Sequence, residues 1–268
     1  EEIMQTVGFI GCGNMGSAII YGISRAKEFH VAGYDHNPEK LQKLENECGL
    51  LPCSGEEELV KKSDIVVIAV KPYAVEELLL RIKEFLTSDT IIVSIAAGVS
   101  IAAIKKICPF CPVSVIMPNT PAMVGEGCTA LCFDDGMLQD VHKETIKKIF
   151  ACVGTTCILP EAQFAEFSTL IGSGPAFVFY MLEAMLEGAI RLGFKYDDAK
   201  KMLEQLFLGS TKLARQNSGI PYAKLRLNVC SPKGTTIAGM NSLDKNAVRG
   251  AVIEAIMATF DRNLELKK

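Results

Sequence analysis

The chain has 268 residues, a net charge of −3, 49% hydrophobic residues and 22% charged residues. Such a length allows one large domain or two modest ones, and the composition is that of an ordinary soluble globular protein. Because no basic surplus exists to neutralise a phosphate backbone, nucleic acid is not expected as the main partner.

Membrane insertion and secretion are also not expected. The longest uncharged apolar-rich stretch, residues 167–182, is interrupted by Gly172-Ser173-Gly174-Pro175 and is too short to span a bilayer. No secretory signal pattern precedes the first strand pattern at Val7. Ten cysteines without a small-scaffold framework indicate reduced thiols, so we expect a cytoplasmic protein with no membrane partner.

Neither redox nor metal chemistry is favoured by the cysteines and histidines. Cys108 and Cys111 have the spacing of a redox motif, but a helical pattern precedes them and a strand pattern follows. A thioredoxin-like motif requires the reverse order. The three histidines do not stand at ligand spacing from cysteine pairs, so we predict no metal site.

Short apolar runs predict the strands of the first part of the chain. Their hydrophobicity is continuous, which is typical of a parallel sheet buried on both faces. The predicted strands are Val7–Ile10, His30–Tyr34, Ile65–Val70, Ile91–Ile95 and Val113–Met117, with two more near Thr129–Phe133 and Thr155–Leu159.

Helical patterns alternate with these strands. Ser54-Gly55-Glu56-Glu57 resembles a capping box, and Ser100 stands where an N-cap is expected before a helix that begins at Ile101. A further helix is predicted around Gly136–Cys152. The alternation predicts a doubly wound, mostly parallel α/β domain over residues 1–160.

Strand patterns end at Pro160, and residues 161–268 are predicted to form an all-helical domain with a thin core of its own. One helix carries apolar residues at four-residue spacing with alanines beside them. This face suits either an ordinary core helix or a dimer seam, and we favour the seam of a homodimer or higher homo-oligomer. Its residues are Val248, Ala251, Val252, Ala255, Ile256, Ala258 and Phe260.

The segment Gly11-Cys12-Gly13-Asn14-Met15-Gly16 directly follows a predicted strand and begins a helix, as a dinucleotide-binding loop does. Its first glycine permits a tight turn, its second lets a pyrophosphate approach the backbone, and its third lets helix and strand pack closely. The helix N-terminus offers free N–H groups to the phosphates. Asp35 ends the second strand, where an acid can bind the adenosine ribose hydroxyls, and His36 follows it.

Three more strand ends carry small, stiff or polar residues. Ligands bind at the carboxyl ends of strands in open α/β sheets, so we expect these segments to wall a nicotinamide cleft. Lys71 either contacts a phosphate or ribose or is a solvated loop lysine. The segments are Ala69-Val70-Lys71-Pro72, Ser94-Ile95-Ala96-Ala97-Gly98 and Met117-Pro118-Asn119-Thr120-Pro121.

Two motifs lie in the helical half. Gly172-Ser173-Gly174-Pro175-Ala176 interrupts a helical pattern, as a kink or a helix N-terminus would. Residues 228–236 form a hydroxyl-rich turn before a helix. Their N–H groups suit a carboxylate ligand, and their hydroxyls alternatively cap the helix that follows.

The motifs G-C-G-N-M-G, A-V-K-P, M-P-N-T-P, G-S-G-P-A and S-P-x-G-T-T, in this order and spacing, resemble those of the pyrroline-5-carboxylate reductases. The resemblance extends from Val7 to beyond Gly239. It implies a Rossmann-type domain followed by an all-helical dimerisation domain that interlocks with a second subunit. It also implies hydride transfer from NADPH or NADH to 1-pyrroline-5-carboxylate, which gives L-proline as the final step of proline biosynthesis.

The resemblance assigns roles to individual residues. Thr236 matches the threonine that hydrogen-bonds the substrate ring nitrogen, and it is the predicted catalytic residue. The predicted substrate-binding residues are Asn228, Ser231, Lys233, Gly234, Thr235 and Thr236. The predicted cofactor-binding residues are Gly11, Cys12, Gly13, Asn14, Met15, Gly16, Asp35, His36, Ala69, Val70, Lys71, Pro72, Ala97 and Asn119.

Two departures from the family pattern affect these roles. Lys233 stands where glycine is usual, which alters the loop's flexibility or adds a cation. Asp35 and His36 stand where many members carry a neutral residue and an arginine. Because Asp35 would accept hydrogen bonds from an unmodified ribose and repel a 2′-phosphate, we expect NADH to be used at least as well as by many relatives.

Two other functions remain alternatives. A 3-hydroxyacid-type dehydrogenase shares this plan but typically needs a lysine in the first long helix of the second domain, and residues 161–190 contain none. A catalytically silent dinucleotide sensor would keep the glycine loop without needing Thr236. Reduction of a protonated iminium needs no histidine base, which agrees with motifs that carry no histidine.

Overall fold

The computed structural model describes residues 4–265 and divides into two compact units, the first ending at Gly172 and the second beginning at Ser173. The two predicted domains also include residues 1–3 and 266–268, which lie outside the described part of the chain.

The predicted domain boundary at residue 160 falls earlier than this division. After the last strand, the chain continues through a 3-10 turn, the short helix α7 (Phe164–Phe167) and a π-helical turn (Ser168–Gly172). Phe164 and Phe167 are buried in the core of the first unit. Their burial is the physical reason that this segment packs with the sheet.

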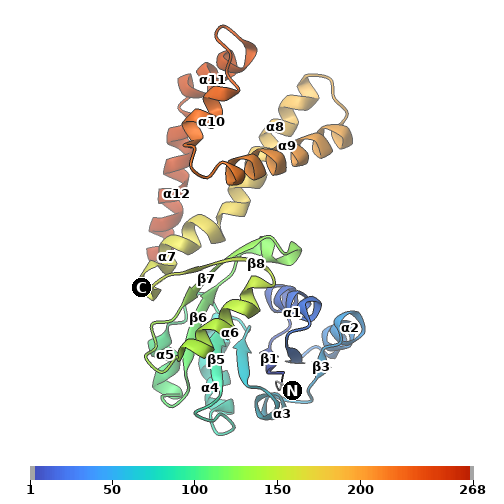
Figure 1. The fold of residues 1–268 in the computed structure, drawn as a ribbon, viewed down its shortest axis with the longest axis vertical. Helices are drawn as coiled ribbons and strands as arrows, with labels where there is room; N and C mark the ends of the chain where they lie inside the picture. The colour runs from blue at the N-terminus through green and yellow to red at the C-terminus, as the bar shows by residue number, and fades with distance from the viewer. Residues whose placement is uncertain (1–3, 266–268) are drawn as a thin grey trace. The chain divides into compact units, whose positions relative to one another are not determined.

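An eight-stranded sheet runs through the first unit in the order β3-β2-β1-β4-β5-β6-β7-β8 (Figure 1). Neighbouring strands are parallel except β6 and β7, which are antiparallel. The predicted doubly wound, mostly parallel sheet is confirmed. The strands are β1 (Thr6–Ile10), β2 (His30–Tyr34), β3 (Leu51–Pro52), β4 (Ile65–Ile68), β5 (Ile91–Ser94), β6 (Val113–Met117), β7 (Gly127–Cys132) and β8 (Gly154–Ile158).

Strand boundaries differ from the sequence predictions at a few places. The edge strand β3 was not predicted, because two exposed residues carry no hydrophobic run. Strands β4 and β5 end before Val70 and Ile95, respectively. Both residues instead belong to loops that leave the carboxyl ends of the strands.

Each face of the sheet is covered by helices. Alternate residues of β4 point to opposite faces, so Val66 and Ile68 join one buried cluster while Ile65 and Val67 join the other. One cluster contains side chains from α3 (Glu56–Lys62), α4 (Val75–Ile82) and α5 (Ile101–Ile107). The other contains side chains from α1 (Asn14–Ala26), α2 (Pro38–Cys48) and α6 (Asp140–Ala151).

The predicted helix starts are partly correct. Ser100 caps α5, since its hydroxyl accepts a hydrogen bond from the Ala103 N–H at 3.0 Å. The predicted capping box at Ser54 is wrong, because Gly55 is the N-cap of α3. Ser54 instead donates to the Glu58 carboxylate through its N–H at 2.8 Å and its hydroxyl at 2.6 Å.

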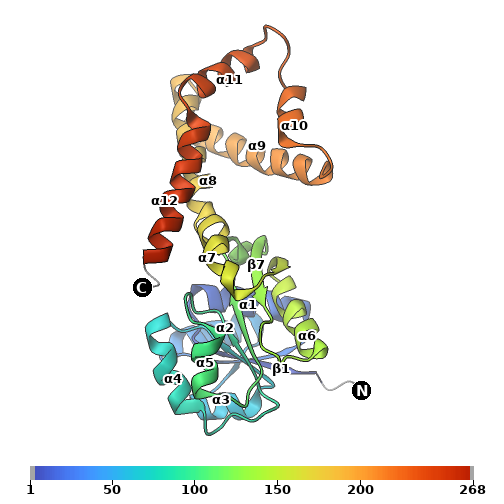
Figure 2. The same ribbon diagram turned by 90° about the vertical axis from the view of Figure 1, so that its left-hand side faces the viewer.

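The second unit is helical in its described residues, with α8 packed on α9 and α11 on α12 (Figure 2). α8 begins at Gly174 with Pro175 in its first turn, so the predicted interruption at this motif is a helix start. The helices are α8 (Gly174–Arg191), α9 (Tyr196–Gln216), α10 (Tyr222–Asn228), α11 (Thr235–Lys245) and α12 (Val248–Glu265).

Large apolar side chains of this second unit are exposed in the single chain. Ala199 is the one hydrophobic residue of its described part that is buried. Phe179, Tyr180 and Leu192 are 66%, 70% and 81% exposed. A helical unit with so little buried apolar surface cannot supply its own core, so this surface requires a cover.

The stretch Glu161–Arg191 is long and apolar enough to cross a membrane when judged by length and composition alone. It is not one regular α-helix, because a 3-10 turn, a π-helical turn and Pro175 interrupt it. From Gly174 onward its apolar side chains, such as Phe179 and Tyr180, add to the uncovered surface of the second unit.

Asp135 joins three segments of the first unit. Its Oδ2 accepts hydrogen bonds from the Val113 N–H at 2.8 Å and from Lys105 Nζ at 3.1 Å, and its Oδ1 accepts from the Met137 N–H at 3.1 Å. Burial acts to raise the pKa of this carboxyl. The hydrogen bonds and the lysine charge outweigh burial, so its pKa lies below the ordinary value of 3.8.

We expect Asp135→Asn to lower the free energy of unfolding by about 1.5–3 kcal/mol near neutral pH, because it removes hydrogen bonds to a charged group. Since the folded-state pKa is depressed, this contribution is complete above the unfolded pKa and is lost as pH falls through the folded value. Urea unfolding from neutral pH down to about pH 3 measures the difference. The exposed Asp89→Asn is the control, and a difference that grows in acid would contradict the assignment.

Candidate functional site

A cleft of about 700 Å³ lies at the carboxyl ends of β1, β2, β4 and β5. The glycine loop contributes Gly11, Gly13, Asn14, Met15 and Gly16 to its lining. From the other strand ends, the predicted residues that line it are Asp35, His36, Ala69, Val70, Lys71, Pro72 and Ala97.

Steric constraints explain the glycines of the loop. Gly11 has a φ of +98°, and a Cβ there would lie 2.8 Å from the Ala69 carbonyl oxygen. At Gly16 a Cβ would lie 2.5 Å from the Gly11 carbonyl oxygen, so glycine permits the helix to pack on the loop. At Gly13 a Cβ would meet nothing within 4 Å, which leaves open space over this backbone. The residues therefore fit a ligand that approaches the loop closely.

The first turn of α1 is suited to an anion. Gly13 is its N-cap and makes no side-chain capping hydrogen bond, and the turn contains no acidic residue. Ser17 braces the loop through its hydroxyl, which donates to the Cys12 carbonyl at 3.0 Å. The N–H groups and the positive end of the helix dipole thus remain directed at the open space over the loop.

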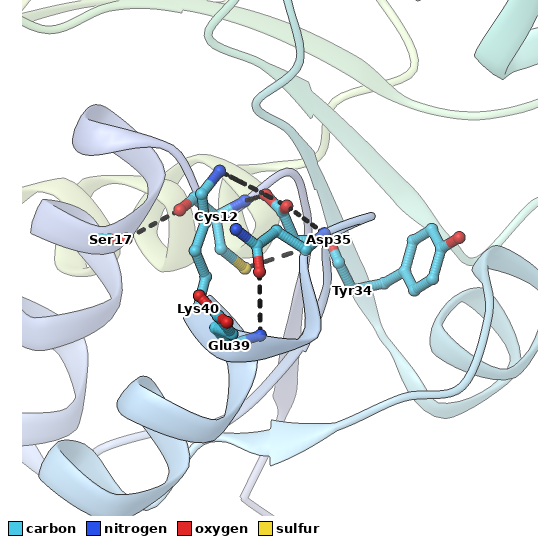
Figure 3. A network of polar contacts seen from close by, with 7 residues as sticks. Cys12, Ser17, Tyr34, Asp35, Glu39 and Lys40 are labelled. Carbon is cyan, nitrogen blue, oxygen red and sulfur yellow. Dashed lines mark hydrogen bonds and ion pairs between the residues drawn. The ribbon is translucent and has the colours of Figure 1, made fainter.

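Asp35 fastens the glycine loop to the end of β2 (Figure 3). Its Oδ2 accepts a hydrogen bond from the Cys12 N–H at 2.7 Å, and its Oδ1 accepts one from the Asn37 N–H at 2.9 Å. Lys40 Nζ lies 3.4 Å from each carboxylate oxygen. The side chain of Asp35 is 12% exposed.

These contacts determine the ionisation of the two partners. Burial acts to raise the pKa of Asp35, but the Asn37 and Cys12 amides and the Lys40 charge outweigh it and lower the pKa overall. Burial, with the Asp35 charge, raises the pKa of the Cys12 thiol to about 12. The buried Cys12 thiol is therefore unreactive, and the Cys12 N–H is hydrogen-bonded to Asp35. Cys12 was predicted to contact the cofactor, but it is not among the residues that line the cleft.

Asn119 also lies away from the lining of the cleft. It is buried, with its Oδ1 accepting from the Cys128 N–H at 2.9 Å and its Nδ2 donating to the Ile171 carbonyl at 3.2 Å. The structure thus brings two of the three predicted strand ends to the cleft. At the third, the asparagine amide holds the loop against its neighbours.

Further side chains line the cleft without having been predicted, among them Lys40, Glu56, Tyr73 and Arg81. Arg81 binds both oxygens of Glu56, at 2.7 and 2.9 Å, and also Glu77 at 2.8 Å. The sequence gave one usable indication, since Lys40 lies only five residues after the strand-end acid Asp35, in the first turn of the helix that follows.

The remaining predicted residues lie in the second unit. Asn228 ends α10, and a loop of residues 229–234 leads to α11. Gly234 is the N-cap of α11 and donates its N–H to the Ser231 carbonyl at 3.0 Å. No side chain caps this helix in the described chain, so the alternative that loop hydroxyls cap it is wrong. Ser231, Thr235 and Thr236 are exposed.

Lys233 adopts a left-handed conformation, with a φ of +61°. This backbone region favours glycine, which explains the residue that is usual at this position. The lysine side chain is exposed.

The doubly wound sheet, the glycine loop and the cleft at the strand ends define the chain as a Rossmann-type dinucleotide-dependent oxidoreductase with a helical second unit. Two family models match it. One, described as NADP oxidoreductase coenzyme F420-dependent, covers residues 6–98. The other, described as pyrroline-5-carboxylate reductase dimerisation, covers residues 161–266.

Relatives match over almost the whole chain. The pyrroline-5-carboxylate reductase of Methanosarcina acetivorans is 33% identical over 98% of each chain. That of Escherichia coli is 32% identical over 98% of this chain and 99% of its own. The chain therefore belongs to the pyrroline-5-carboxylate reductase family, as its motifs predicted.

Solved structures of pyrroline-5-carboxylate reductases have the same fold along almost the whole chain. The pyrroline-5-carboxylate reductase of Coxiella burnetii has a TM-score of 0.92 and 29% identity, covering 99% of this chain and all of its own. The pyrroline carboxylate reductase of Plasmodium falciparum, solved with NADP bound, has a TM-score of 0.86 and 28% identity over 98% of each chain.

We expect Gly13→Ala to weaken dinucleotide binding by about tenfold or more, with only the small loss of melting temperature that replacing an N-cap glycine by alanine causes. The added methyl group meets no protein atom but occupies the open space over the loop. Gly55→Ala is the matched control, because Gly55 is the N-cap of α3 and also has open space around its Cβ. Fluorescence titration with NADPH gives both affinities, and equal binding by the two variants would contradict the assignment of the loop.

Proposed function

We propose that this chain reduces 1-pyrroline-5-carboxylate to L-proline with NAD(P)H, the final step of proline biosynthesis. The observation that carries the proposal is the match to the family along the whole chain, with the glycine loop and its cleft intact. The enzyme is an oxidoreductase that acts on a CH–NH group.

The first unit holds the nucleotide. When bound, NAD(P)H supplies the hydride. The amides at the start of α1 face the pyrophosphate, and Gly13 leaves the approach open. Asp35 keeps the loop in position and lies where the adenosine ribose binds in this fold. Ala97, in the loop after β5, gives the cleft a small-residue wall beside a flat ring.

The loop before α11 holds the substrate. We assign the carboxylate of the substrate to the backbone N–H groups of residues 231–235, with Asn228 and Lys233 beside them. The Thr236 hydroxyl orients the ring nitrogen and relays its proton. A protonated iminium is already electrophilic, so positioning accounts for most of what the protein must add.

Association of two chains completes the second unit. Its exposed apolar side chains, among them Phe179 and Leu192, need a cover, and its residues match the dimerisation model of the family. We assign the seam to α12 and its alanines, in a homodimer or a higher homo-oligomer.

A cytoplasmic location follows from the same proposal. All ten cysteines are free thiols, as in proteins of reducing compartments. The partners are the small-molecule substrate and further copies of the chain, without nucleic acid or membrane.

One assay separates the candidate functions. Initial rates with pyrroline-5-carboxylate are measured with NADPH and with NADH on the purified protein. Turnover of the cyclic imine supports the reductase. Oxidation of 3-hydroxyacids without imine turnover would favour the dehydrogenase, and dinucleotide binding without turnover would favour the sensor.

We expect Thr236→Val to lower kcat/KM for the imine by about ten- to a hundredfold, because it removes a hydrogen bond to a charged nitrogen worth about 1.5–3 kcal/mol. NADPH affinity and melting temperature should stay unchanged, since this hydroxyl does not cap α11. Thr236→Ser keeps the hydroxyl and should retain most activity. Full activity in the valine variant would remove Thr236 from the catalytic site.

We expect the protein to sediment as a dimer or larger assembly at micromolar concentration. Ala255→Glu should shift it toward monomers and abolish activity, because it places a charge in the proposed seam. Ser88→Glu adds the same charge at an exposed position of the first unit and serves as the control. A stable, active monomer would refute the seam.

A further inference from the structure

Asp35 is a charge-compensated acid in this structure. An ionised carboxylate offers about four acceptor positions. Two are taken by the Cys12 and Asn37 amides, and Lys40 Nζ lies 3.4 Å from both oxygens. The sequence-based expectation treated Asp35 as a bare charge that repels a 2′-phosphate. The positive charge of Lys40 beside it offsets part of that repulsion.

Lys40 is held loosely enough to move. Its contacts with Asp35 are long for a charge-assisted hydrogen bond, and its side chain is 46% exposed. It lines the cleft. Arg81, which also lines the cleft, differs because it is bound to Glu56 and Glu77 by short hydrogen bonds, while Lys71 lies at the end of a different strand, β4, away from Asp35.

The position of Lys40 in its helix is unfavourable for a cation. Asn37 is the N-cap of α2, so Lys40 lies in the first turn, next to the positive end of the helix dipole. An acidic residue there would stabilise the helix. Lys40 therefore does not stabilise the start of α2. Because it is directed at the Asp35 carboxylate and lines the cleft, we infer that its role is in the cleft.

We propose that Lys40 sets the selectivity between the two dinucleotides. With NADPH, its ammonium binds the 2′-phosphate and leaves Asp35 to its two backbone amides. With NADH, Lys40 stays on Asp35 and occupies the oxygens that the ribose hydroxyls would otherwise engage. The lysine therefore shifts the preference toward NADPH in spite of Asp35. The inference rests on the proposed use of NAD(P)H.

Dissociation constants for NADPH and NADH, measured without substrate by the fluorescence of the reduced nicotinamide, test this role. We expect Lys40→Gln to weaken NADPH binding by about tenfold, the loss of one hydrogen bond to a charged group. NADH binding should stay unchanged or become tighter, because Asp35 is released. Lys40→Arg should keep the preference of the unmodified protein. These are binding readouts, so they hold even where the imine is not the substrate.

Lys43→Gln is the matched control. Lys43 lies on the same helix, is exposed and does not line the cleft, and its replacement changes the net charge equally. Its two dissociation constants should match those of the unmodified protein. Equal weakening of both dinucleotides by Lys40→Gln would make Lys40 a positioning residue for the loop and overturn the proposal. An unchanged ratio of the two constants would overturn it as well.

Discussion

The reversal of strand order between β1 and β4 is the constraint on which the nucleotide site depends. From β1 the chain winds outward through β2 and β3, and from β4 it winds the other way through β5 and β6. The loops that leave β1 and β4 therefore diverge and open a cleft at the carboxyl ends of the strands. Gly11 lies where the two loops pass close to each other, since a Cβ there would touch the Ala69 carbonyl. Topology creates the cleft, and the side chains around it adjust what it accepts.

The second unit obeys a different constraint. The sheet of the first unit buries both of its faces under helices of the same chain, so that its two apolar clusters are closed. The helices from α8 to α12 bury almost nothing by themselves, although α8 is rich in large apolar side chains. Burial is what stabilises helices of this length, because propensity alone is marginal in water. The uncovered apolar side chains of this unit agree with its match to the dimerisation model of the family.

Local patterns account for what the sequence predicted correctly. Continuous apolar runs identified the central strands, and the spacing of three glycines identified the loop, because both depend only on near neighbours in the chain. The edge strand β3 is too short to leave such a pattern. The Ser54 capping box failed because Glu58, one residue further along the helix than predicted, accepts the hydrogen bonds of Ser54.

Side chains that reach the cleft from outside the motifs were not predictable in this way. Arg81 comes from α4, and its place at the cleft depends on its pairing with Glu56 at the start of α3. Asn119 lies at a strand end, as predicted, but its side-chain amide is hydrogen-bonded to the backbones of Cys128 and Ile171. Hydrogen bonds to residues outside the motifs, between nine and 52 positions away in sequence, decided both cases, and the motif patterns do not reveal such partners.

The two departures from the family pattern are each explained by their surroundings. At Lys233, a left-handed backbone costs a non-glycine residue about 1–2 kcal/mol, and an exposed turn lets the long side chain extend without a clash. At Asp35, an acid that is only slightly exposed would be costly without partners, and two amides and Lys40 supply them. Lys233 is tolerated because its side chain is exposed, whereas the charge of Asp35 is compensated by its contacts with two amides and Lys40. A compensated residue is coupled to its partners, so the effect of Asp35 on the bound nucleotide can be understood only together with Lys40.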